Sequence, residues 1–94
     1  MAYADEQSYE EMIRALQNFK QQTQEQCQIM TDAGRDCVEN TDNDPAATKS
    51  SSKLSTCVSK IQESLETVDS VIAALEEELE AIREAARKAD QIDE

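Results

Sequence analysis

Apolar residues in the second half of the chain recur at alternating spacings of four and three. The repeat has a period of 3.5 residues and continues without a break from Leu54 to Ala89. A helix with this period carries one apolar stripe, which leaves water only when another helix packs along it. The pattern therefore predicts a long helix that packs against other helices. Its apolar positions are Leu54, Val58, Ile61, Leu65, Val68, Ile72, Leu75, Leu79, Ile82, Ala86 and Ala89.

The first half of the chain carries a weaker repeat of the same period, with polar residues at two stripe positions in its middle. It predicts a first helix over residues 6–39, capped by Ser8 or, one turn earlier, by Asp5. Gly34 lies inside the repeat, and we interpret it as a helical glycine at which another backbone comes close. The predicted stripe is Tyr9, Met12, Leu16, Phe19, Thr23, Gln26, Met30, Ala33 and Cys37, flanked by Ile13, Cys27 and Ile29.

A break between the two repeats falls at residues 40–45. It is rich in Asn and Asp, which favour turns, and it ends at Pro45, which suits the first position of a helix capped by Asp44. We therefore expect a turn over residues 40–45 and a second helix over residues 46–90. A start of this helix near residues 50–52 is the alternative.

Together these elements predict an all-α fold, an antiparallel two-helix hairpin resembling a coiled coil. The whole chain, residues 1–94, is expected to be a single domain that ends in a short acidic tail, residues 91–94. A lone hairpin buries little apolar area against the entropy of ordering its chain. The hairpin is therefore expected to complete a four-helix bundle with a partner or with a second copy.

One flank of the second stripe is wider than a two-helix contact requires, because Val71, Ala74, Ala81 and Ala85 lie beside it. The alternative is that these are ordinary helix-forming residues on a solvated surface. We predict that the stripe and this flank bind the partner. The predicted partner interface is Leu65, Val68, Val71, Ile72, Ala74, Leu75, Leu79, Ala81, Ile82 and Ala85.

The charge of the chain narrows the classes of partner. Its 94 residues include 21 acidic and nine basic side chains, for a net charge of −12. Nucleic acids and anionic membranes need clustered Lys and Arg, so both are disfavoured. No apolar run is long enough to span a membrane, and the first ten residues lack the pattern of a secretory signal peptide. Any export is therefore expected to use another route.

The residue types present argue against catalysis. The chain has no His and no Gly-rich phosphate loop, which excludes Ser-His and Cys-His pairs and P-loop sites. Its acidic run, residues 76–80, is expected to be a solvated helix face rather than a pair of catalytic carboxylates. The spacing of Cys27, Cys37 and Cys57 does not suit zinc. We expect no enzymatic activity, no metal and no cofactor.

The cysteines allow one further hypothesis. With the turn centred near residues 43–47, antiparallel partners have position numbers that add up to about 90 to 94, which places Cys37 beside Cys57. These two residues are then candidates for a disulfide that links the two helices in an oxidising compartment. The alternative is that all three cysteines are small buried helix residues.

In size and pattern the chain resembles the WXG family of small helical-hairpin substrates of type VII secretion. The stretch of residues 15–25 is similar in character to that family's first helix, and residues 74–90 are similar to its second. The Trp-x-Gly turn is absent. The family's export element, Tyr followed later by an acid, has Asp90 in place but Ala86 where Tyr should stand.

Such departures occur among the small helical partners of LXG-type toxins of Gram-positive bacteria. This resemblance implies an adaptor or co-secreted partner that binds the helical N-terminal domain of a toxin, with the partner completing a composite export signal. It also implies a cytoplasmic protein that is then secreted or displayed at the cell surface. The alternative of a different class is an intracellular coiled-coil scaffold or self-assembling structural protein.

Overall fold

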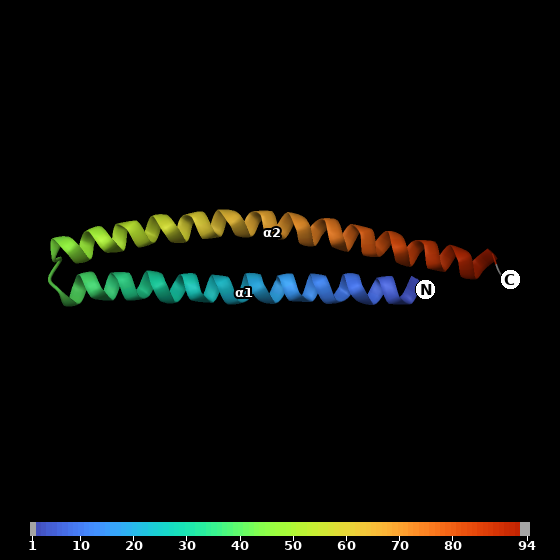
Figure 1. The fold of residues 1–94 in the computed structure, drawn as a ribbon, viewed down its shortest axis with the longest axis horizontal. Helices are drawn as coiled ribbons and strands as arrows, with labels where there is room; N and C mark the ends of the chain where they lie inside the picture. Colours follow the sequence, from blue (N-terminus) through green and yellow to red (C-terminus); the bar gives the residue numbers. More distant parts are fainter. Residues whose placement is uncertain (1, 93–94) are drawn as a thin grey trace. The chain divides into compact units, whose positions relative to one another are not determined.

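The computed structural model describes residues 2–92 and confirms the all-α two-helix hairpin. Helix α1 spans Ala2–Asn40 and helix α2 spans Pro45–Ile92, and a turn at residues 41–44 joins them (Figure 1). The last two residues of the predicted acidic tail lie outside the described residues.

The ends of the helices differ in how well the sequence marks them. At the start of α2, the Asp44 carboxylate accepts hydrogen bonds from the amides of Ala46 and Ala47 at 3.1 and 3.2 Å. This is the predicted cap, and it satisfies amides that a helix start otherwise leaves unpaired. At the other end of the chain, α1 already includes Asp5 and Ser8, so neither residue begins the helix.

The turn is closed by the main chain. The amide of Asn43 donates to the carbonyl of Val38 at 2.9 Å, and that of Asp42 donates to Glu39 at 3.3 Å. This pair of bonds is a Schellman motif, which satisfies carbonyls at the end of a helix. Asp42 and Asn43 adopt φ values of 52° and 64°. Asn and Asp tolerate this left-handed conformation better than other residues with a side chain.

We predict that Asn43→Val lowers the free energy of unfolding by roughly 1 to 2 kcal/mol, because a β-branched residue is strained at positive φ. Thermal unfolding followed by circular dichroism measures the change. Asn18→Val is the matched control, since Asn18 is exposed in the middle of α1. Equal loss in both variants would show that the conformation of the turn is not the cause.

Contacts divide the hairpin into two units, each containing parts of both helices. The terminal unit comprises the described residues of Met1–Phe19 and Val68–Glu94. Its core is formed by Ile13 of α1 with Ile72 and Leu79 of α2. Half-buried apolar residues from both helices pack around this core: Tyr9, Leu16, Val68 and Leu75.

The turn unit comprises Lys20–Thr67. Cys27, Val58 and Leu65 are its buried apolar residues. At Gly34 the two helices approach closely, because an added Cβ would lie 3.0 Å from the Ser51 hydroxyl oxygen and 3.4 Å from a methyl group of Leu54. Gly34 is helical, as predicted, but the groups that come close to it are side chains of α2 rather than its backbone.

The predicted stripe of α1 is wrong by one residue at several positions. Met12, Phe19 and Gln26 are exposed, whereas the residue that follows each of them, Ile13, Lys20 or Cys27, points inward. The observed stripe includes a lysine where the predicted stripe has Phe19. Lysine is tolerated at a half-buried position because its apolar stem packs while its amine reaches the surface.

Candidate partner interface

Six residues of the predicted partner interface belong to the stripe of α2 and face α1. Leu65, Ile72 and Leu79 are buried, each within its own unit, and the other three are half-buried. They hold the hairpin together and leave little surface for another protein, which corrects their assignment as an outward interface. The half-buried members are Val68, Leu75 and Ile82.

The widened flank of α2 is in fact open to solvent. Val71 retains 39% of its accessible surface, and the three alanines beside the stripe are exposed. These alanines are Ala74, Ala81 and Ala85. The surplus of apolar surface on α2 therefore lies where the sequence indicated, on the part of α2 that belongs to the terminal unit.

Helix α1 contributes two large apolar side chains that were not assigned to the interface. Met12 and Phe19 are 51% and 53% exposed. They were missed because they were placed in the stripe between the helices. A large exposed apolar residue costs free energy in water, about 25 cal/mol for each Å² of surface that a partner would cover.

Exposed apolar residues of both helices lie on the same side of the terminal unit. The helices are antiparallel, so a residue that immediately precedes a stripe position projects to the same side in either helix. Accordingly Met12, Ser8 and Leu75 line one shallow hollow together with Tyr9. We call this side the outer apolar face, defined as Met12, Phe19, Val71, Ala74, Ala81 and Ala85.

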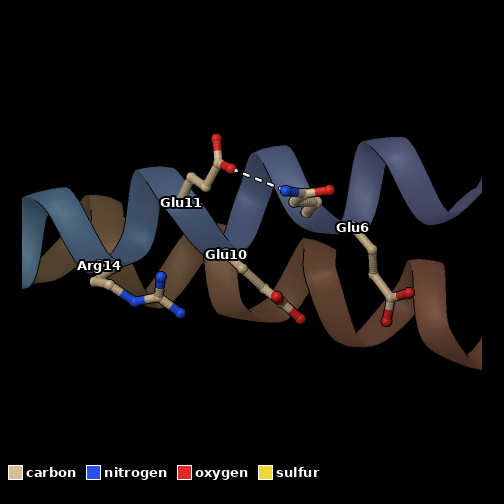
Figure 2. A pocket seen from close by; sticks show the side chains of 5 residues that line it. Glu6, Glu10, Glu11 and Arg14 are labelled. Carbon is tan, nitrogen blue, oxygen red and sulfur yellow. Dashed lines mark hydrogen bonds between the residues drawn. The ribbon is translucent and has the colours of Figure 1, made fainter.

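The opposite side of the terminal unit is polar. Here Arg83 donates hydrogen bonds to the carboxylates of Glu6 and Glu10, at 2.7 and 2.6 Å. In Figure 2 both carboxylates project over α2, whereas Glu11 points away and accepts a hydrogen bond from Gln7. The bond to Glu6, followed by that to Glu10, raises the pKa of the Arg83 guanidinium above its usual value. This interaction joins the two helices by charge.

We predict that Arg83→Gln speeds amide hydrogen exchange several-fold in the first turns of α1, because it removes both bonds that join this segment to α2. Arg87→Gln is the matched control, since Arg87 binds Glu80 and Glu84 within its own helix. Hydrogen-exchange mass spectrometry distinguishes the two. If exchange near the start of α1 became faster in Arg87→Gln but not in Arg83→Gln, the assignment of Arg83 as the link between the two helices would be contradicted.

Because of this interaction, we expect the stability of the terminal unit to change little in the moderately alkaline pH range. A raised pKa means that the stabilising charge on Arg83 is present below the usual arginine pKa and is lost only above it. Arginine is therefore charged throughout the neutral and moderately alkaline range. Nor do Glu6 and Glu10 form a free carboxylate pair for acid-base chemistry, because Arg83 occupies both.

The structure does not bring Cys37 and Cys57 together. Both are free and exposed, whereas Cys27 is buried. The turn is centred between residues 42 and 43, so facing position numbers add up to about 85 rather than to the expected 90 to 94. Cys57 then lies about 13 Å farther along α2 than the point opposite Cys37, too far for a disulfide.

The two positions of the candidate export signal differ in exposure. Ala86 is half-buried on the stripe of α2, and Asp90 is exposed one turn later. Both residues lie within α2. No helix within residues 2–92 combines the length and the hydropathy that a membrane crossing requires.

The apolar residues exposed on one side of the terminal unit indicate a protein partner or an oligomer. Comparisons with known proteins do not identify the partner. No protein-family model matches the chain, and neither a curated protein nor a solved structure matches it.

Proposed function

We propose that this protein is a non-enzymatic helical adaptor that binds another helical protein through the outer apolar face. The observation that supports this most strongly is the contrast between the two sides of the terminal unit. One side exposes Met12, Phe19 and Val71, while the other carries the charges of Arg83 and its glutamates. A helical hairpin that had only to remain folded would not need an apolar side facing water.

The spacing of the face favours a helix as the occupant. Met12 and Phe19 are separated by two turns of α1. The alanines on α2 are small, which permits the close axial approach at which helices pack, about 8 to 10 Å. One helix lying along α1 and another along α2 would complete a four-helix bundle. The partner would therefore contribute a pair of helices with an apolar stripe on each.

In finer detail, we propose a type VII secretion adaptor, co-secreted with the LXG-type toxin whose helical N-terminal domain it binds. The resemblance to the WXG family supports this proposal, together with a hairpin architecture that is consistent with that family. The missing tyrosine at Ala86 fits a composite export signal in which the toxin supplies the absent element. Asp90, exposed in the last turns of α2, would be this chain's part of it.

Co-expression with the N-terminal domain of an LXG toxin from the same gene neighbourhood tests the proposal. We expect the two chains to copurify as a stoichiometric complex whose thermal stability exceeds that of this protein alone. Loss of toxin export after deletion of this chain would support the finer proposal. If the toxin domain and this protein elute separately, the adaptor proposal is contradicted.

The alternative is a coiled-coil scaffold that assembles from copies of this chain. The same exposed face favours it, since an apolar side can also be covered by identical molecules. A scaffold is expected to form a tight, higher-order homo-oligomer before any partner is added. Analytical ultracentrifugation of the purified protein separates the two functions, because an adaptor should remain monomeric or dimeric.

A further inference from the structure

The short turn decides whether α1 packs on α2 of its own chain or on α2 of another copy. Only residues 41–44 separate the end of α1 from Pro45, the first residue of α2. If these residues were helical, α1 and α2 would form one continuous helix that could not fold back on itself. Its apolar stripes would then leave water only by packing on those of a second copy. We call this state, with α1 of each copy on α2 of the other, the exchanged dimer.

The contacts between the helices do not by themselves favour the hairpin over the exchanged dimer. Gly34 lies against Ser51, and Ile13 shares a core with Ile72, so in both pairs the position numbers add up to 85. Two straight antiparallel helices, related by a two-fold axis midway between residues 42 and 43, bring the same pairs together. The stripes of α1 and α2 differ in phase by one residue, which a continuous coiled coil absorbs by local overwinding. The choice between the two states therefore depends on the turn.

Two residues of the turn favour the hairpin. Asp42 and Asn43 have φ values of 52° and 64°, far from those of a helix. Both residue types adopt this left-handed conformation more readily than other residues with a side chain, and both form helices less readily than Ala. Straightening the turn would also break the hydrogen bond from the Asn43 amide to the Val38 carbonyl.

Pro45 disfavours the continuous helix directly. Within such a helix its nitrogen could not donate to the carbonyl of Thr41, and its ring would clash with that carbonyl. It would also disfavour the helical conformation of Asp44, the residue before it. At the first position of α2 the missing donor is not needed, and the Asp44 carbonyl accepts from the amide of Thr48 at 2.9 Å. Pro45 therefore suits the hairpin and opposes the exchanged dimer, in which it would occur twice.

We propose that Asp42, Asn43 and Pro45 form a conformational barrier that prevents this chain from exchanging α1 with a second copy. Without the barrier, the sequence forms the exchanged dimer. Such a dimer repeats the contacts of the hairpin and leaves the outer apolar face of each copy uncovered. If the proposed function holds, the exchanged dimer would bind two partners and the hairpin only one. The barrier itself does not depend on that function.

A pair of turn variants tests the barrier. The alanine variant carries Asp42→Ala, Asn43→Ala and Pro45→Ala, which together allow a continuous helix. The glycine variant carries Asp42→Gly, Asn43→Gly and Pro45→Ala. It is the matched control, because glycine readily adopts positive φ and disfavours a helix. We expect the alanine variant to form the exchanged dimer and the glycine variant to remain a hairpin.

An introduced disulfide distinguishes exchange from other association. A Cβ atom added at Gly34 would lie 3.7 Å from that of Ser51, within the range of about 3.5 to 4.5 Å that a disulfide requires. Gly34→Cys and Ser51→Cys are therefore combined in a chain whose own cysteines, Cys27, Cys37 and Cys57, are replaced by Ala. In a hairpin the new disulfide lies within one chain, whereas in the exchanged dimer it joins two chains. Association through the outer apolar face leaves it within each chain.

Each chain is refolded at high protein concentration, oxidised, and analysed by mass spectrometry without reduction. We expect a monomer with one internal disulfide for the native turn and for the glycine variant. The alanine variant should raise the ratio of covalent dimer to monomer about tenfold or more, since removing Pro45 removes its cost from both chains. Circular dichroism checks that each variant is helical. If the alanine variant does not fold, Pro45→Ala alone should raise the same ratio, by a smaller factor.

Three results would overturn the proposal. The first is an internal disulfide in the alanine variant, or in Pro45→Ala where that variant replaces it, because the turn would then not be what prevents exchange. The second is as much covalent dimer in the glycine variant as in the alanine variant, because left-handed conformation would then have no role. The third is a covalent dimer formed by the chain with the native turn, because no barrier would then exist.

Discussion

Replacing Ile72 with Asp is expected to unfold the terminal unit. Ile72 is buried between the two helices, in the core that it forms with Ile13 and Leu79. Removing a buried Ile side chain to Ala usually costs about 2 to 5 kcal/mol. A carboxylate in the same place adds the cost of removing a charge from water, and no cation lies in this core to compensate. A small helical core gives only a small free energy of unfolding, so a loss of this size is enough to unfold it.

Circular dichroism and thermal unfolding measure the effect of this substitution. The matched control is Ala73→Asp, which introduces the same charge at the next residue of α2, on the exposed surface. The control should keep its helical signal and a melting temperature close to that of the wild type. An Ile72→Asp variant that melts as the control does would show that the assigned core does not hold the helices together.

Replacing Met12 and Phe19 with Glu is expected to abolish binding of the proposed helical partner while leaving the hairpin folded. Both side chains are more than half exposed, so their loss removes little packing within the chain. In the complex each would lie against apolar surface, where an unpaired carboxylate costs several kcal/mol. Loss of even one such anchor typically weakens binding by about 2 kcal/mol or more, roughly thirtyfold. The double substitution should therefore leave no measurable complex.

Copurification with the partner proposed above, followed by titration calorimetry, measures this effect. The control variant carries Gln17→Glu and Ala73→Glu, which add the same charge at exposed positions on the opposite, polar flank of the terminal unit. It should bind as the wild type does. Equal loss in both variants would assign the effect to overall charge rather than to the outer apolar face. Undiminished binding by the Met12 and Phe19 variant would exclude the outer apolar face as the binding site.

The second helix shows how much a strong pattern determines. From Leu54 to Ala86 every predicted stripe position is buried or half-buried, and the flank at Val71 is exposed as expected. A single apolar stripe with polar neighbours leaves only one orientation in which the helix can pack. The same stripe was also predicted to bind a partner, but its residues are buried or half-buried within the hairpin.

The first helix shows where the pattern is ambiguous. Two stripes, one containing Met12 and Phe19 and the other Ile13 and Lys20, share several positions and differ elsewhere by one residue. Their apolar content is similar, so local propensity does not choose between them. The structure selects the stripe whose Ile13 meets Ile72 and whose Gly34 admits Ser51. That choice moved two large apolar residues from the core to the surface, and with them the candidate interface.

The sequence by itself determined the two helices, the turn with its Asp44 cap and the inward face of α2, because these follow from local conformational preference and one unambiguous apolar stripe. Only the tertiary structure decided the rotation of α1, the level at which the helices face each other and the separation of Cys37 from Cys57. Each of these depends on contacts between residues distant in the chain. A turn shorter by one residue, or a helix rotated by one position, changes every such contact while leaving the local pattern intact.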